Sequence, residues 1–214
     1  MKSKLALLAA TAALVSALFF SCNSNEQSKK DASEDSSSVT VASKNDYGGF
    51  PDEVAWGRHL VNLGGCNDCH TSKVMTKMGP MPDTTMLLAG HPAKVPAPQI
   101  DRKEVESKGL IVTNDLSVWV GPWGITYAAN LTPDDTSGLG AWTEEQFIRC
   151  LRQGKVNGAA SARPLLPPMS FVAEALNHDA SDAELKAIFA YLKSIPAVHN
   201  VVPAPEPPLM AARH

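Results

Sequence analysis

The stretch LGGCNDCH, residues 63–70, contains the pattern C-x-x-C-H, and the rest of the chain is best interpreted outward from it. Cys66 and Cys69 fall on neighbouring faces of one helical turn, and His70 follows directly. Two thiols at this spacing can bond the two vinyl-derived carbons of a porphyrin, while the adjacent imidazole ligates the iron. With 4 Cys and 6 His in 214 residues, chance produces the pattern in roughly 2 of 1000 such chains. It therefore predicts one covalently attached haem c, with His70 as an axial ligand.

Two other uses of these thiols remain open from the sequence. A disulfide or thioredoxin-like redox pair is typical of a β-α-β pattern around the cysteines, which is not evident here, and it leaves His70 unexplained. A zinc site needs a fourth ligand from Cys150 or a distant histidine, and the chain lacks the second C-x-x-C or H-x-x-x-H that usually supplies it. Both alternatives account for less of the motif than haem attachment does.

The amino terminus has the features of an export signal. Lys2 and Lys4 precede an apolar run over residues 5–20, which is short for crossing about 30 Å of hydrocarbon. The run ends at FFSC, residues 19–22, which resembles the lipobox of bacterial lipoproteins and implies a lipidated Cys22. An uncleaved anchor or ordinary secretion is the alternative. We expect an exported protein on the periplasmic side of the cell envelope, anchored to a membrane by lipid.

Composition divides the chain into four parts. Residues 1–21 form the expected lipoprotein signal peptide, and residues 22–46, rich in Ser and charged side chains, are expected to be a disordered tether. Residues 47–200 contain the C-x-x-C-H motif and the amphipathic segments, so we expect the folded domain there. Residues 201–214 are expected to form a proline-rich, extended tail.

Charge limits the class of partner. The chain has 19 basic and 22 acidic residues, a formal net charge of −3 and a pI near 6.1. It therefore offers no basic field for a phosphate backbone, and we expect no nucleic-acid partner. A hydrophobic content of 44% is enough for one ordinary core.

Three amphipathic segments predict helices. The first begins near Pro51 and ends at the glycines of residues 64–65, so that it delivers the cysteines. The second ends at Gly154 and the third before Pro196. The second and third open with capping-box pairs, which are Thr143 with Gln146 and Ser181 with Glu184. Cys150 lies on the apolar face of the second helix and is expected to be a buried thiol.

A haem iron held by His70 needs a sixth ligand, and Met169 is the candidate. Four methionines, at positions 75, 78, 81 and 86, follow His70 too closely to reach the opposite face of the macrocycle. Met169 lies in the segment RPLLPPMS, residues 163–170, where prolines restrict the backbone and stiffen the loop. Such a loop can hold a thioether against iron with little loss of entropy.

Together these motifs resemble the class I monohaem cytochromes c of bacteria. The resemblance covers most of residues 50–203 and rests on the segments WGRHLV (56–61), PPM (167–169) and AIFAYL (187–192) around the C-x-x-C-H. NLTPD (130–134) and WTEE (142–145) are similar to a subgroup found among dehydrogenase-associated and lipoprotein cytochromes. The resemblance implies a mainly α, class I cytochrome c fold, with several helices around one covalent haem. Residues 71–130 depart from it as an enlarged, irregular segment.

The resemblance also implies two contacts. In the family, the first and last helices cross through a small residue and an aromatic residue, and Gly57 and Tyr191 hold those positions. Gly79-Pro80 resembles the loop after the haem motif, so the Pro80 carbonyl is expected to accept a hydrogen bond from the His70 imidazole. Pro82 is a second candidate for this role, and a surface turn without haem contact is the alternative.

Three further residues are candidates for contacts with the haem. Trp123 is expected at the haem edge, with core packing as the equal alternative. Asn130 and Arg163 are candidates for donating hydrogen bonds to the propionates, with a solvated surface as the alternative. Nearby, residues 111–113 and 118–120 predict a short β-hairpin that the turn residues 121–124 end.

The function expected from these features is one-electron transfer by a lipid-tethered monohaem cytochrome c. Such a protein would carry electrons between a respiratory donor and an acceptor, with a dehydrogenase, an oxidase or another cytochrome as its redox partners. The alternative is a haem enzyme, or the cytochrome subunit of a dehydrogenase, with a displaceable distal ligand. We expect no catalytic residues of the chain's own.

Overall fold

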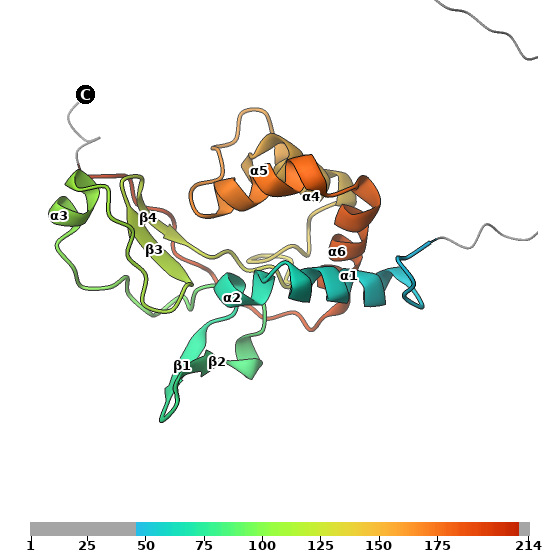
Figure 1. The fold of residues 1–214 in the computed structure, drawn as a ribbon, viewed down its shortest axis with the longest axis horizontal. Coiled ribbons are helices and arrows are strands. Elements are labelled where there is room, and N and C mark those ends of the chain that lie inside the picture. Colours follow the sequence, from blue (N-terminus) through green and yellow to red (C-terminus); the bar gives the residue numbers. More distant parts are fainter. Residues whose placement is uncertain (1–45, 210–214) are drawn as a thin grey trace, which may run out of the picture. The chain divides into compact units, whose positions relative to one another are not determined.

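The computed structural model describes residues 46–209. The expected signal peptide, Cys22 and residues 22–45 of the expected tether lie outside the described residues, as do residues 210–214. The described part contains six α-helices: α1 (Glu53–Leu63), α2 (Cys66–His70), α3 (Arg102–Ser107), α4 (Glu144–Gln153), α5 (Met169–Asp179) and α6 (Asp182–Ser194) (Figure 1). It also contains two short 3-10 helices, η1 (Thr84–Met86) and η2 (Val156–Gly158). Of these described helices, none combines the length and apolar character needed to cross a bilayer.

The predicted helix ends are confirmed. Asp52 is the N-cap of α1, and its carboxylate accepts a hydrogen bond from the Ala55 amide at 2.8 Å. The capping boxes at the starts of α4 and α6 are both formed. Gly154 ends α4 in a left-handed conformation, with φ of 62°, which glycine adopts without steric cost.

Helices α1 and α6 pack closely because Gly57 has no side chain. A Cβ at this position would clash with the Ala187 carbonyl oxygen and would lie 2.9 Å from the Tyr191 Cβ. The expected contact between Gly57 and Tyr191 is therefore confirmed.

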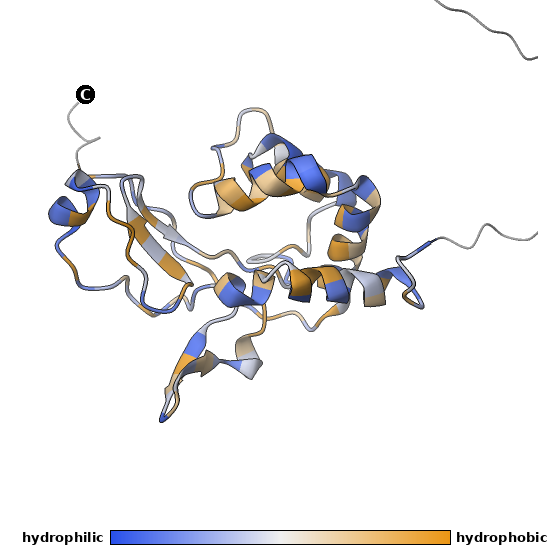
Figure 2. Cartoon of the chain, in the orientation of Figure 1, coloured by the Kyte–Doolittle hydropathy of each residue, from blue (hydrophilic) through white to orange (hydrophobic). Residues whose placement is uncertain are grey.

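The helices enclose the first apolar cluster. Phe147 of α4 and Phe189 of α6 lie in it with ring centroids 5.2 Å apart, and Leu185 and Val61 are fully buried. Figure 2 shows the hydrophobic positions along α1 and α5. Cys150 is 8% exposed, so its expected burial is confirmed.

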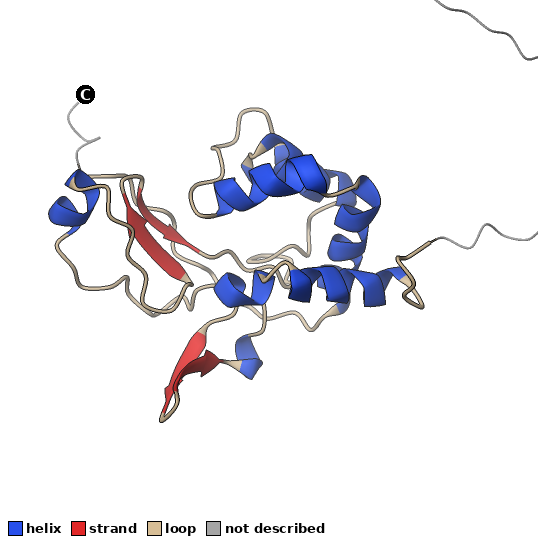
Figure 3. Cartoon of the chain, viewed as in Figure 1, coloured by secondary structure: helices blue, strands red, loops and turns tan. Residues whose placement is uncertain are grey.

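A second apolar cluster lies between α3 and a β-hairpin. Strands β3 (Val118–Gly121) and β4 (Gly124–Tyr127) are antiparallel, with Val120 paired to Ile125 (Figure 3). The cluster consists of Val105, Val118, Val120 and Ile125. The prediction that residues 121–124 end the hairpin is wrong: they contain its turn, and the expected partner, residues 111–113, contributes only a single bridge from Val112 to Val120.

The proline-rich segment after residue 200 contacts this second cluster. Glu206 exchanges both backbone hydrogen bonds with Ile125 of β4, at 2.9 and 3.0 Å. Its carboxylate pairs with Arg102 of α3 at 2.8 Å. Residues 206–209 are thus bonded to the domain.

A second hairpin, which the sequence pattern does not predict, follows the C-x-x-C-H motif. Strand β1 (Lys73–Thr76) pairs with β2 (Gly79–Pro82), with Val74 opposite Met81 and Met75 opposite Pro80. Met75 and Met78 are 79% and 90% exposed. Residues 71–130 therefore contain two hairpins and α3 rather than one irregular segment.

Candidate haem site

The C-x-x-C-H motif forms the short helix α2 directly after α1. Gly65 is its N-cap in a left-handed conformation, with φ of 65°, and it lets the chain turn between the two helices. Cys66 and Cys69 are free, half-buried thiols. Cys66 packs against the first apolar cluster, so the helix presents its first thiol toward the core.

The His70 imidazole is held by a backbone carbonyl from a distant segment. Its Nδ1 lies 2.7 Å from the Ala129 oxygen, and because a carbonyl can only accept, Nδ1 must carry the proton. Burial lowers the pKa of His70, which favours the neutral ring. Within residues 46–209, Nε2 has no partner. The ring is thus oriented by the protein and open at Nε2, as a metal-ligating histidine must be.

The electrostatics of the two thiols differ from those of a redox pair. Burial raises the pKa of the Cys66 thiol and of the Cys69 thiol, whereas the attacking thiol of a C-x-x-C redox motif has a lowered pKa. Residues 46–209 also contain no group of three or more His, Cys, Asp or Glu side chains that could hold a metal ion. Neither the redox-pair nor the zinc alternative gains support.

The donor set therefore fits a haem c. Two unpaired thiols lie three positions apart on one helical turn, which matches the two attachment points of the porphyrin. An imidazole with an unpartnered Nε2 follows them. Cys66, Cys69 and His70 are the residues that would hold this group.

Met169 is the first residue of α5 and is half-buried. It packs against the same apolar cluster as Cys66, so the structure brings both residues to one core. The loop before it is held by the Thr126 hydroxyl, which donates to the Pro167 carbonyl at 2.7 Å. Ligation of iron by Met169 stays a prediction.

The expected role of Pro80 is wrong. Pro80 lies in strand β2 opposite Met75, because the chain after His70 continues into the β1–β2 hairpin. The carbonyl that meets the imidazole belongs instead to Ala129, which lies 59 residues after His70 and immediately before the NLTPD segment. A backbone carbonyl of alanine has no side-chain signature; its position next to NLTPD was the only available signal.

The structure gives Asn130 hydrogen-bond partners within the protein, and its contact with a propionate stays a prediction. Its side chain is buried, with 4% exposure for the residue. Its amide donates to the Ser137 hydroxyl at 3.1 Å and to the Val198 carbonyl at 2.8 Å. Its oxygen accepts from the Thr132 amide and hydroxyl. Both amide protons are therefore donated to groups of the protein itself.

Trp123 and Arg163 each donate a hydrogen bond to a residue close by in the sequence. Trp123 is half-buried at the β3–β4 turn, where its indole N–H donates to the Thr126 hydroxyl at 3.3 Å. Arg163 is exposed and donates to the Pro164 carbonyl at 3.1 Å. Their contacts with a haem stay predictions.

No protein-family model matches this chain. It is 34% identical over 83 residues to a subunit of nicotinate dehydrogenase from Pseudomonas putida, which covers 39% of this chain and 6% of that protein. It is 28% identical over 145 residues to the fructose dehydrogenase cytochrome subunit of Gluconobacter japonicus, which covers 66% of this chain and 22% of that protein. It is 30% identical over 82 residues to the gluconate 2-dehydrogenase cytochrome c subunit of Pantoea cypripedii, which covers 38% of this chain and 16% of that protein.

The matched segments span between 6% and 22% of the length of these three relatives. Two of the three are named as cytochrome subunits of dehydrogenases. These similarities support a cytochrome c that carries haem c.

Proposed function

We propose that this chain is the electron-transfer subunit of a dehydrogenase at the cell envelope. It would carry a single haem c on Cys66 and Cys69, with His70 and Met169 as the residues that would bind its iron, in a domain of the class I cytochrome c type. The observation that carries the proposal is the geometry of His70, because Nδ1 is bonded to a backbone carbonyl while Nε2 is left open beside two free thiols.

The similarity to cytochrome subunits of dehydrogenases favours a subunit over a freely diffusing carrier. In this proposal the dehydrogenase supplies electrons, and an oxidase or another cytochrome accepts them. Lipid on Cys22 would hold the subunit to the membrane on the periplasmic side, and residues 23–46 would act as its tether. The lipobox-like FFSC segment supports this location.

When bound, the haem supplies a one-electron couple, and a thioether ligand favours its reduced form. The chain's own residues would limit the structural change during transfer. His70 keeps its orientation because Nδ1 is bonded to Ala129 in the folded protein. Met169 begins a helix whose preceding loop is fixed to β4 through Thr126 and Pro167. Ligands that move little between the two oxidation states keep the reorganisation energy of electron transfer small.

The attachment is tested by exporting the protein in a host competent for cytochrome maturation. We expect the wild-type haem to resist extraction with acidified acetone, and the double variant Cys66→Ala/Cys69→Ala to release any haem it binds. A colourless wild-type protein with both thiols titratable would contradict the proposal.

The distal ligand is tested by Met169→Ala, with Met78→Ala as the matched control, because Met78 is 90% exposed on the hairpin turn. The ferric wild-type protein should show a sulfur-to-iron charge-transfer band in the red, lost in Met169→Ala and kept in Met78→Ala. High-spin iron in the wild-type protein would favour the catalytic alternative.

The assignment to a dehydrogenase is tested by purification from detergent-solubilised membranes. We expect the cytochrome to be recovered with a larger catalytic subunit whose substrate reduces the haem. If the cytochrome is recovered alone and only added electron carriers reduce it, the result would instead support a freely diffusing carrier. Cys22→Ala should release the protein from the membrane fraction.

A further inference from the structure

Two chain segments lie together against the carboxyl end of α2. The Gly90 amide donates to the His70 carbonyl at 2.7 Å, and the His91 amide donates to the Ala128 carbonyl at 2.9 Å. The Leu131 amide donates to the Leu88 carbonyl at 2.8 Å. Residues 88–91 are therefore bonded both to the end of α2 and to residues 128–131, which contain the carbonyl that meets His70.

Gly90 permits this close approach. Its φ is 79°, and a Cβ here would lie 2.5 Å from the Ala128 oxygen and 2.7 Å from the Ala129 oxygen. These distances are too short for a side chain, so glycine is required for the Ala129 carbonyl to sit where it does.

Asn130 fixes the peptide unit to which that carbonyl belongs. The Ala129 oxygen and the Asn130 nitrogen are part of one planar group, so anchoring Asn130 restrains the direction of the carbonyl. Both the oxygen and the nitrogen of the Asn130 side chain are hydrogen-bonded. The oxygen accepts from the Thr132 amide at 2.9 Å and from the Thr132 hydroxyl at 2.8 Å. The nitrogen donates to Ser137 and Val198.

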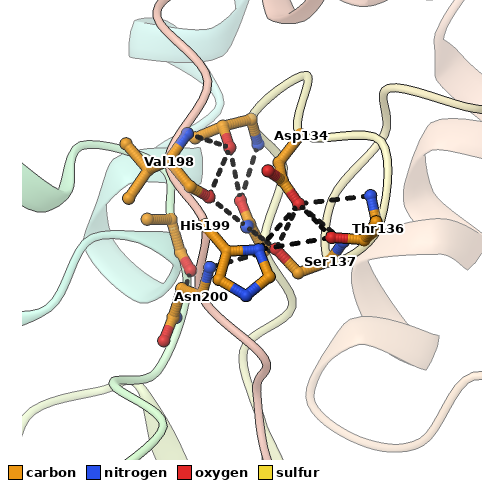
Figure 4. A network of polar contacts seen from close by, with 9 residues as sticks. Asp134, Thr136, Ser137, Val198, His199 and Asn200 are labelled. Atoms are coloured by element: carbon orange, nitrogen blue, oxygen red, sulfur yellow. Dashed lines mark hydrogen bonds and ion pairs between the residues drawn. The ribbon is translucent and has the colours of Figure 1, made fainter.

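A third segment, residues 198–200, closes the network (Figure 4). The Val198 amide donates to the Thr132 hydroxyl at 3.1 Å, and the Asn200 amide donates to the Ser137 hydroxyl at 3.0 Å. The Asn200 side chain donates to the Ala89 and His91 carbonyls. The same network therefore reaches back to the segment that contains Gly90.

From these contacts we propose that Asn130 is a positioning residue for His70. Its carboxamide holds the Ala129 carbonyl against Nδ1 and so sets the orientation and basicity of the imidazole as an iron ligand. This inference rests on the proposed haem attachment at His70. It assigns to Asn130 a role toward His70, which differs from the propionate contact expected from the sequence.

A backbone acceptor on Nδ1 makes Nε2 a stronger donor, which stabilises ferric iron. Loosening the Ala129 carbonyl should therefore favour the ferrous state and raise the reduction potential. For Asn130→Ala we expect about a tenfold shift of the redox equilibrium toward the ferrous form, which is about 59 mV for one electron. The proton on Nδ1 of His70 should also exchange with solvent faster.

A milder pair of variants protects the test against misfolding of Asn130→Ala. Thr132 is fully buried, and its hydroxyl joins Asn130 to Val198. Thr132→Val keeps the shape and removes the hydroxyl, and should shift the redox equilibrium about threefold in the same direction. Thr132→Ser keeps the hydroxyl, so this variant should have the same reduction potential as the wild-type protein.

Arg152→Met is the matched control. Arg152 donates to the carbonyls of Leu176, Asn177 and Ala180, so it ties backbone together as Asn130 does, but at the junction of α4 and α5. This variant should lower the melting temperature without changing the potential or the exchange of the Nδ1 proton.

The measurements are the midpoint potential and the NMR signal of the His70 Nδ1 proton in the haem-loaded protein. Unchanged values in both Asn130→Ala and Thr132→Val, or equal changes in Arg152→Met, would overturn the positioning role. Lack of covalent haem in the wild-type protein would instead refute the proposed function, so the two failures are distinguishable.

Discussion

The two apolar clusters of this protein are built in different ways. The first lies among α1, α4, α5 and α6, and three of these helices, α1, α4 and α6, begin at side-chain caps that bond three residues along the chain. The second joins α3 to β3 and β4 and is completed by residues from the far end of the chain, because Glu206 pairs with Ile125. Local signals specify the first cluster, whereas the second depends on contacts that form only when distant segments meet.

The largest expected effect is on the first cluster, from Gly57→Ala. The new Cβ would clash with the Ala187 carbonyl oxygen, so α1 and α6 must separate. We expect the free energy of unfolding to fall by about 3 kcal/mol, even though alanine favours a helix by about 1 kcal/mol relative to glycine. Unfolding by denaturant of the variant and the wild-type protein measures this difference in the free energy of unfolding.

The control for this variant is Gly109→Ala. Gly109 has a φ of 67° with no atom within 4 Å of an added Cβ, so only backbone strain applies. We expect a loss of about 1–2 kcal/mol. If Gly57→Ala costs no more than this control, close packing of α1 and α6 is not what stabilises the first cluster.

Gly124→Ala is the corresponding change in the second cluster. Gly124 has a φ of 96°, and a Cβ would lie 2.7 Å from the Pro207 carbonyl carbon, so residues 206–208 must move away from β4. We expect a loss of about 2 kcal/mol and faster hydrogen exchange at the Ile125 amide. Unchanged exchange at Ile125, with the helices equally stable, would show that the segment is held by other contacts.

Arg102→Met should have a smaller effect. Arg102 pairs with Glu106 at 2.9 Å, and the Glu106 side chain is only 3% exposed, so the change leaves a buried carboxylate without its cation. We expect a loss of about 1–2 kcal/mol. Lys108→Met removes an exposed pair with Glu104, whose side chains are 61% and 53% exposed, and should cost less than about 0.5 kcal/mol. Equal costs in thermal unfolding would contradict this distinction.

The smallest effect concerns pH. The Ser137 hydroxyl and amide, which donate to Asp134, hold the pKa of that carboxyl well below its ordinary value of 3.8. A depressed pKa stabilises the folded state above pH 3.8, and this contribution is lost as the pH falls toward the lower, folded-state pKa. Asp134→Asn should therefore lose less stability than the wild-type protein on acidification below pH 4. Parallel melting-temperature curves for the two proteins would refute this.

The sequence predicted those parts of the molecule whose signals are local. Thr143 with Gln146 and Ser181 with Glu184 indicated two helix starts, and both capping boxes formed. The C-x-x-C-H spacing predicted one helical turn, which is α2. The contact of Gly57 with Tyr191 followed from the resemblance, since periodicity alone does not say which helices cross.

The parts that could not be predicted depend on backbone groups brought together from afar. Any residue can supply a carbonyl, so nothing in the side chains distinguishes Ala129 from Pro80 as the partner of His70. Asn130 has the donors that a propionate needs, but it uses them on Ser137 and on Val198, which lies 68 residues away. The sequence does not predict the β1–β2 hairpin, because its apolar residues are exposed and mark no buried face.

The pairing of Ile125 with Glu206 bears on where the domain can be cut. A fragment ending at residue 200, the boundary suggested by composition, would expose the outer edge of β4 and deprive Arg102 of one of its two carboxylates. Unsatisfied strand edges invite association between molecules. Any truncated version intended for biophysical work should therefore retain the chain through residue 209, where the Leu209 amide bonds the Glu106 carboxylate.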